Sequence, residues 1–474
     1  MIRLPPRDIL DRLKPIERFG LGVLLDCSRL LAVDDPAADV VRLSLGSGEH
    51  TTVSDGEVAF PRARLAQLAE FAAGAGEQRS TASDRVGRVP PSENALVKLN
   101  HIRDPAVSRE GPALRKAVEQ AAGRRPVRGL APWPAGRRWA VAMTHDLDLV
   151  ANWFGYTLLR VTELASRLRL WQAAEALANG LAWLGRNPVW QGVSEVLTVE
   201  REFELRATWF VICGTPTLAT MRAGDISYAP ESAPVQRILE AVAAAGHEVG
   251  LHGSFETMLD AGKFREQRDR LGRLAAAPAT GVRQHFLRMR PGATHREMAA
   301  AGFSYDATWG FSDRNGFRLG VADIIPGWDA EREALSGLDE APLIWMDRAL
   351  SKHRGVDQPD RWVDDALELA KACREVNGAW VGLWHPNLTP PLGFPRAPGA
   401  FRRLVEVLMG GQPYADRLDR LVSWRAARRS VRATRIRPDG SIELRADRKW
   451  DGPAVIEDFR GGLAQSQSWP GPRG

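Results

Sequence analysis

Two carboxylates stand close together in residues 144–148 (THDLD), directly after an apolar run at 139–143. Residues two apart on a strand point to the same side of it, so Asp146 and Asp148 can act as a pair. One carboxylate of such a pair can bind a cation while the other accepts a proton. Taken alone, the motif fits a helix cap followed by a turn aspartate equally well.

Two histidines occupy comparable positions at the ends of apolar segments. His252 follows residues 248–251 and precedes small residues, and His385 follows residues 379–383. An imidazole in a loop after a strand could ligate a metal, although an ordinary loop histidine has the same local sequence. Three widely separated apolar segments thus end in Asp or His, which predicts that these residues converge on one site.

The segments that would position these residues alternate between short apolar strands and helices. Such alternation is typical of a parallel α/β architecture, either a barrel or an open sheet, with the active site at the C-terminal ends of the strands. Strands are predicted at residues 139–143, 207–213, 248–251, 284–288 and 379–383, and helices at 156–186, 234–245, 264–275 and 295–301.

Flanking regions of different character surround this central part. Residues 1–135 are predicted to form an N-terminal α/β region, with strands at 23–25 and 40–45 and helices at 62–73 and 112–122. Prolines at 126, 132 and 134 mark its end. The central domain would span 136–400. Residues 401–474 would add an Arg-rich helix at 417–429 and short strands at 441–446 and 453–456.

Composition narrows the class of protein. The net charge of +6 over 474 residues is a mild excess without a Lys/Arg-rich block, so we expect no nucleic-acid partner. Three widely spaced cysteines argue against a disulfide framework and against a Cys-based metal site. Early prolines and charges, and the lack of a long apolar window, predict neither a signal peptide nor a membrane span, and a cytoplasmic location by default. The oligomeric state is left open.

Taken in order, these motifs resemble the polysaccharide deacetylase (NodB-homology, carbohydrate esterase type) family over about residues 139–390. The family's Ala-Thr-Phe-Phe-Val strand is matched by residues 207–211, and its Gly-His-Glu-Ile-Gly-x-His by 246–252. Arg283, residues 302–303 and residues 383–385 match its later Arg, Gly-Phe/Tyr and Leu-x-His motifs. The Thr-His-Asp-x-Asp form is similar to an outlying branch. The resemblance implies a distorted (β/α) barrel.

The resemblance also implies roles for individual residues. Asp146 would be the catalytic base, positioned by Arg283, and His385 the acid that protonates the leaving group. Asp148 and His252 would bind a divalent metal, usually Zn²⁺, which polarises the substrate carbonyl and lowers the pKa of its bound water. The implied reaction is hydrolysis of a C–N amide that removes acetyl from an N-acetylated sugar or polysaccharide, so the expected partner is a carbohydrate or small amide.

One position departs from the family pattern. Glu256 stands where the second motif of the family has a histidine. A carboxylate can replace imidazole at Zn²⁺, but His285 in the unusual motif Arg-Gln-His could also supply the third ligand. We favour His285, with Glu256 as the second choice. The alternative function is a non-catalytic sugar-binding or scaffold protein, and retention of Asp146, Asp148 and His385 favours the enzyme.

Other polar residues have weaker context. Arg318 lies in an apolar frame, which indicates a buried ion pair. Asp306 and Asp313 could orient a neighbouring group. Four histidines have no supporting motif and are predicted to lie on the surface: His50, His101, His295 and His353.

Overall fold

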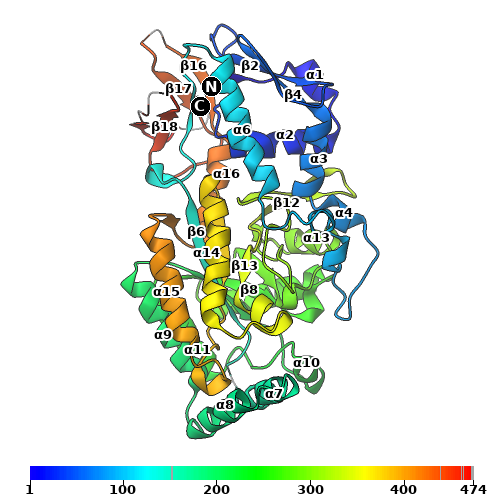
Figure 1. Cartoon of the computed structure of the whole chain (residues 1–474), viewed down its shortest axis with the longest axis vertical. Helices are drawn as coiled ribbons and strands as arrows, with labels where there is room; N and C mark the ends of the chain where they lie inside the picture. Colours follow the sequence, from blue (N-terminus) through cyan, green and yellow to red (C-terminus); the bar gives the residue numbers. More distant parts are fainter. Residues whose placement is uncertain (151–152, 438, 461, 463, 471–474) are drawn as a thin grey trace.

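The structure is a computed structural model that describes residues 1–150, 153–437, 439–460, 462 and 464–470. The molecule is elongated, with the N- and C-terminal regions together at one end and the α/β domain at the other (Figure 1). No helix within these residues has the length and apolar character needed to cross a bilayer.

The α/β domain is built on a ten-stranded sheet in the order β11-β12-β10-β9-β8-β7-β6-β14-β13, with β15 also paired to β6. All of its pairings are parallel except that of β11 with β12. The strands are β6 (Ala140–Leu147), β7 (Thr208–Ile212), β8 (Glu248–Gly253), β9 (Gly281–Gln284), β10 (Tyr305–Asp306), β11 (Ile325–Asp329), β12 (Ala334–Glu340), β13 (Trp345–Met346), β14 (Ala379–Leu383) and β15 (Tyr414–Ala415).

Helices follow most of these strands, and most of these helices cover the outer face of the sheet, whereas α16 packs on the inner side. Their buried side chains form one core with the outward-facing strand residues. The helices of this domain are α7 (Trp153–Ser166), α8 (Leu170–Ala182), α9 (Pro188–Glu202), α10 (Leu218–Ala223), α11 (Ala233–Ala244), α12 (Ala261–Leu274), α13 (Ala293–Ala300), α14 (Pro359–Glu375), α15 (Ala397–Gly410) and α16 (Leu418–Arg429). The predicted α/β architecture, in which parallel strands alternate with helices, is confirmed.

Strand β6 shows how the sequence sorts side chains between the two faces. Val141 and Met143 join the outer core with the helices, whereas Ala140 and Ala142 join an inner core that includes α16. The two-residue period of a strand therefore sends Asp146 to the same inner face as Ala140 and Ala142. The same period sends the neighbouring histidine outward.

The sheet is strongly curled. His285 follows β9 and His385 follows β14, and four strand spacings separate β9 from β14 in the sheet order. In a flat sheet these strands would be about 19 Å apart. Yet the Nε2 atoms of both histidines lie 3.5–3.6 Å from the carboxylate of Asp148. The strand ends thus close around one point, as in an open barrel.

The terminal regions pack against each other at the other end of the molecule. The N-terminal sheet has the order β1-β2-β4-β3, and β5 joins the C-terminal strands β18 and β19. The elements are β1 (Ile2–Arg3), β2 (Val41–Gly46), β3 (Thr52–Ser54), β4 (Glu57–Pro61), α1 (Arg7–Asp11), α2 (Pro15–Ser28), α3 (Arg62–Ala72), α4 (Ala75–Arg79), α5 (Ala95–Lys98), α6 (Ala106–Ala121), β5 (Arg128–Leu130), β16 (Arg432–Ile436), β17 (Ile442–Arg445), β18 (Ala454–Asp458) and β19 (Ala464–Gln467).

Two predicted strands are wrong. Residues 23–25 lie inside helix α2, which is buried along most of its length, so a short apolar run there does not distinguish strand from helix. The strand predicted at 284–288 is displaced: β9 ends at Gln284, and His285–Leu287 form a 3₁₀ turn in which Phe286 has a φ of 58°. This turn directs His285 into the barrel mouth.

Candidate active site

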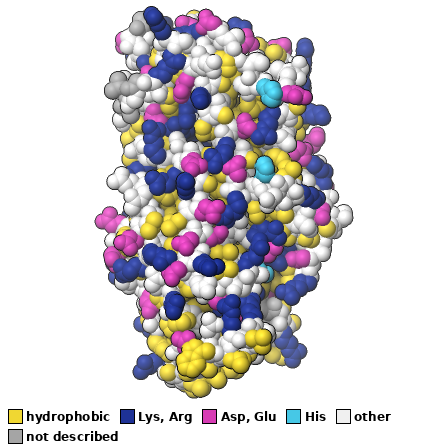
Figure 2. All heavy atoms as spheres, viewed as in Figure 1, with side chains coloured by type: hydrophobic (Ala, Val, Ile, Leu, Met, Phe, Trp, Pro, Cys, Tyr) yellow, Lys and Arg dark blue, Asp and Glu magenta, His cyan; other side chains and the backbone are white. Residues whose placement is uncertain are grey.

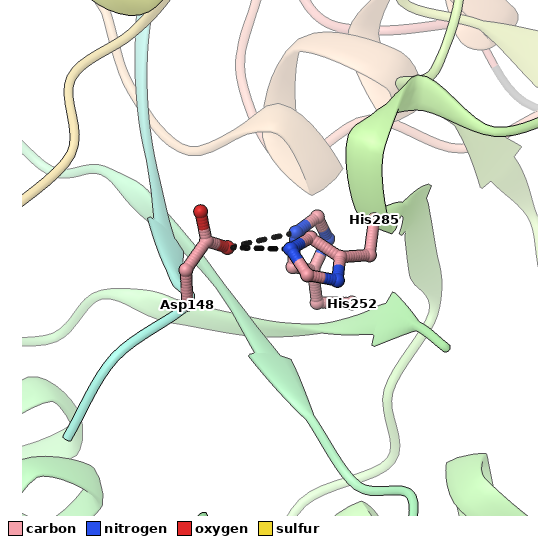
Figure 3. Close-up of side chains that lie close together, drawn as sticks. All are labelled: Asp148, His252 and His285. Atoms are coloured by element: carbon pink, nitrogen blue, oxygen red, sulfur yellow. Dashed lines mark ion pairs between the residues drawn. The ribbon is translucent and has the colours of Figure 1, made fainter. Parts of the chain in front are cut away.

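Three residues chosen from the sequence as metal ligands meet at the C-terminal ends of the strands. Asp148 follows β6, His252 lies in β8, and His285 follows β9. Asp148 Oδ1 is 3.2 Å from His252 Nε2 and 3.6 Å from His285 Nε2. Figure 3 shows the carboxylate of Asp148 pointing at both imidazoles. The structure therefore brings together a carboxylate and two histidines from three different strands.

Hydrogen bonds fix which nitrogen of each imidazole faces Asp148. His252 Nδ1 donates to the backbone carbonyl of Arg283 at 2.9 Å, and His285 Nδ1 lies 3.2 Å from the buried carboxylate of Asp225. With the proton on Nδ1, a neutral ring at either position would direct its Nε2 lone pair at Asp148. Asp148 Oδ1 is itself buried and has no hydrogen-bond partner among the described residues. In that state three electron-rich atoms would face one another.

These residues fit a divalent metal. Bonds of 2.0–2.1 Å in a tetrahedral Zn²⁺ site place two ligand atoms about 3.3 Å apart. The 3.2 and 3.6 Å separations at Asp148 Oδ1 agree with that spacing. Burial alone would raise the pKa of Asp148, but His285, His252 and His385 hold it well below its usual range. Although burial lowers it, Asp146 and Asp148 raise the pKa of His252, so without a cation the imidazoles balance the charge of the carboxylate, a role that a divalent metal would take over.

Asp146 is held by a buried arginine. Its Oδ1 accepts a hydrogen bond from Arg283 Nη1 at 2.9 Å, and Arg283 also donates to Thr144 Oγ1 and to the carbonyl of Ala307. Arg283 is fully buried, and its guanidinium packs over the ring of Phe210. Asp146 Oδ2 lies 3.6 Å from His252 Nε2, beside the candidate ligands. Arg283 thus orients one oxygen of Asp146 and leaves the other facing the site.

His385 lies on the other side of Asp148 and is paired with a carboxylate that the sequence analysis missed. Asp347 accepts both the backbone N–H and the Nδ1–H of His385, each at 2.7 Å. Burial alone would lower the pKa of His385, but the charge of Asp347 raises it to about 9. His385 Nε2 lies 3.5 Å from Asp148 Oδ2. The imidazole is therefore protonated at neutral pH, with Nε2–H directed into the site.

Glu256 does not join this group. It is exposed in the short turn after β8, and the cluster of possible ligand atoms contains Asp148, His252 and His285 instead. Two carboxylates that support the histidines were not identified from sequence, Asp225 and Asp347. Asp347 directly follows β13, so a search for acidic residues at strand ends could have found it. The sequence around Asp225 carries no such signal.

His145, next to the carboxylate pair, faces away from the site. Its Nε2 lies 2.8 Å from Glu200 Oε1 on α9, and its Nδ1 lies 2.7 Å from the carbonyl of Trp384. The strand alternation that turns Asp146 inward turns His145 toward the helices. The ion pair expected of Arg318 is present and buried, with Glu77 as its partner.

The prediction that His295 lies on the surface is wrong. It is buried and its Nε2 is 3.4 Å from Asp306 Oδ2, near Glu340. The backbone N–H of Gly292 donates to His295 Nδ1 at 3.0 Å, so the neutral ring carries its proton on Nε2 and has no lone pair there for a metal. Burial and the neighbouring Asp306 raise the pKa of Glu340 well above its usual range. In this arrangement a proton on His295 Nε2 faces the carboxyl groups of Asp306 and Glu340.

A cavity of about 410 Å³ opens over the site. Asp146, Asp148, His252, His285 and His385 line its floor. Its walls combine apolar and cationic side chains, which include Tyr156, Leu159, Met221, Phe286, Arg348 and Lys352. The volume is in the range of small-ligand sites. A substrate in this cavity would contact the candidate base, acid and metal ligands at once.

Comparison with known proteins gives a likeness in structure only. No family model and no curated protein matches the sequence. A crystal structure assigned as a polysaccharide deacetylase from Mycobacterium smegmatis shares 22% identity, with 62% of this chain and 91% of that chain covered and a TM-score of 0.39. Puue allantoinase shares 16% identity (63% and 93% covered, TM-score 0.41). The chitin deacetylase of Colletotrichum lindemuthianum shares 12% (65% and 93%, TM-score 0.33). These values do not assign an activity to this chain.

Proposed function

We propose that this protein is a metal-dependent hydrolase that removes the acetyl group from an N-acetylated sugar. The observation that supports it is the convergence, around one cavity, of three candidate metal ligands with a buried acid and a buried base. A set of one carboxylate and two imidazoles suits Zn²⁺ and leaves a coordination position open. A metal held by Asp148, His252 and His285 would polarise the substrate carbonyl and favour ionisation of water.

Two side chains, Asp146 and His385, carry out the two proton transfers of this reaction. Water attacks the acetyl carbon, and Asp146, oriented by Arg283, accepts the proton of this water. The C–N bond then breaks, and His385 donates its Nε2 proton to the departing nitrogen, because an amide anion is a very poor leaving group. Acetate and a free amine result, so one water is consumed for each amide. Asp347 keeps His385 charged for this step.

The test is metal content and acetate release from N-acetylated sugars, measured on the same preparations. We expect near-stoichiometric divalent metal in protein purified without chelator, and loss of activity on its removal. Asp146→Asn and His385→Ala should each lower turnover by on the order of 10²–10⁴ while the metal stays bound. Exposed His101 provides a control substitution, His101→Ala, that should change neither. Full activity in EDTA, or full turnover by the His385 variant, would contradict the proposal.

A further inference from the structure

Exposed apolar side chains are concentrated on one part of the surface. Among the described residues, fourteen large apolar side chains are exposed, and nine of them lie on or next to α7, α8 and α10. Figure 2 shows this concentration at the lower end of the molecule, where α7 and α8 lie in Figure 1. We call these nine side chains the apolar surface: Leu158, Leu159, Leu168, Leu170, Trp171, Leu181, Leu184, Leu218 and Met221.

The helical hairpin of α7 and α8 is apolar on the outside as well as on the inside. It buries small residues, Ala173, Ala176 and Gly180, between the helices and against the domain. Meanwhile Leu168 and Trp171 have 86% and 83% of their surface exposed. A helix in water normally directs its large apolar residues inward. An exposed patch of this kind indicates a surface that is covered in the working protein.

The surroundings of the apolar surface are cationic. Residues 153–187, 215–224 and 348–357 contain eight Lys and Arg against three acidic residues, Glu163, Glu175 and Asp357. Asp357 neutralises part of this charge through ion pairs with Arg160 and Arg169. The remaining excess suits an anionic partner. It also disfavours a second copy of this chain, because a symmetric contact would place the two cationic surroundings against each other.

The apolar surface is continuous with the candidate active site. Leu159 of α7 and Met221 of α10 belong to this surface and also line the cavity over Asp148. Arg348 and Lys352 line the same cavity. Arg167 of the hairpin donates to the backbone carbonyls of Ser351 and Lys352, which ties the hairpin to this cationic wall. The mouth of the cavity is thus apolar outside and positively charged within.

We propose that the apolar surface docks on an anionic lipid bilayer, and that the site takes a substrate carried by the bilayer. Trp and Leu side chains beside Arg and Lys are the composition of helices that lie in a membrane interface without crossing it. The substrate class, which rests on the proposed function, is an N-acetylated sugar joined through phosphate to a lipid chain. The lipid chain of this substrate would leave the cavity past Leu159 and Met221. The phosphate of the substrate would face Arg348 and Lys352.

Docking is tested by flotation with vesicles of phosphatidylcholine, with or without phosphatidylglycerol. We expect the chain to float with the anionic vesicles, and less so at high salt. Leu168→Glu together with Trp171→Glu should weaken this binding tenfold or more. The matched control is Leu335→Glu with Val407→Glu, two exposed apolar residues away from the apolar surface, which should bind as the wild type does. Equal flotation of the two double variants, no flotation of the wild type, or a stable dimer that the Leu168/Trp171 variant abolishes, would overturn the proposal.

The substrate class is tested by acetate release from N-acetylglucosamine linked through phosphate to a long isoprenoid alcohol in anionic vesicles, compared with a soluble N-acetylglucosamine oligomer. The wild type should turn over the lipid-linked sugar at least tenfold faster, and the Leu168/Trp171 variant should lose this preference but keep its turnover of the soluble oligomer. Equal rates for the wild type on both substrates would overturn the lipid-linked substrate. If neither substrate is hydrolysed, the proposed function fails, while flotation still decides the docking.

Discussion

The pair of His385 and Asp347 allows a sharp test of the acid step. Asp347→Asn removes the negative charge but keeps the size of the side chain that contacts His385 at 2.7 Å. The rise in the pKa of His385 from 6.5 to about 9 corresponds to about 3 kcal/mol of preference for the charged ring. One opposite charge at this distance typically changes a pKa by about 1–3. We therefore expect the pKa of His385 to fall by that amount in the variant.

The consequence for activity follows from the protonation state that the acid needs. His385 donates a proton, so kcat/KM is lost as pH rises through its pKa. If the pKa falls by about two in Asp347→Asn, the variant would be about tenfold less active at one pH unit below the wild-type pKa of His385, and nearly unimpaired at low pH. A bound divalent cation lowers the pKa of His385 in both proteins. The quantity to measure is therefore the difference between wild type and variant in the pH at which kcat/KM falls on the alkaline side of the profile, called the high-pH limb.

The assay is acetate release over about pH 5 to about pH 10, with saturating metal and a check of metal content at each pH. Asp225→Asn is the control, because it removes a buried carboxylate from His285 rather than from His385. At saturating metal the control should retain the wild-type high-pH limb. A high-pH limb that stays in place in Asp347→Asn, or a loss of equal size at every pH, would refute the reasoning.

The remaining predictions concern the metal. In a chelator competition assay, His285→Ala should lower the metal affinity far more than Glu256→Ala does. The opposite order would identify Glu256 as the third ligand. Asp225→Asn should lower the metal affinity by about 10–100-fold through His285, because carboxylates that orient a ligating imidazole typically contribute that much. Unchanged metal affinity would show that Asp225 does not support the metal site. His295→Ala should leave metal stoichiometry unchanged, and loss of one equivalent would show that the second cluster binds an ion after all.

Much of the fold could be predicted because its strands are short, apolar and regularly separated by helices. The strands at 207–213, 248–251 and 379–383 all agree with the structure within a few residues. The failures have local causes. Helix α2 is buried on most sides, so its apolar run at 23–25 has no helical period to recognise. The turn at His285–Leu287 depends on a positive φ at Phe286. None of the residue types in that segment indicates such a backbone conformation.

The candidate site was predicted less completely, because sequence position shows which residues end strands but not what lies beside them. Asp146, Asp148, His252 and His385 each end or follow a strand, and all reach the same cavity. Asp225 lies in the loop after α10 and Asp347 directly follows β13, and the closed barrel brings them to His285 and His385. His295 was misplaced for a related reason, since its surroundings come from two other strands.

The two candidates for the third ligand, Glu256 and His285, follow different strands, β8 and β9. The resembling family has a histidine at that position, in the turn after β8, whereas here the side chain of Glu256 is exposed to solvent. In the curled sheet the end of β9 lies directly beside the end of β8, with His252 paired to Arg283 in register. His285, two positions after Arg283, therefore lies close enough to His252 for the Nε2 atoms of both to face Asp148. With His285 rather than residue 256 as the third ligand, the proposed set still has one carboxylate and two imidazoles, which is a donor set that suits a catalytic Zn²⁺ site.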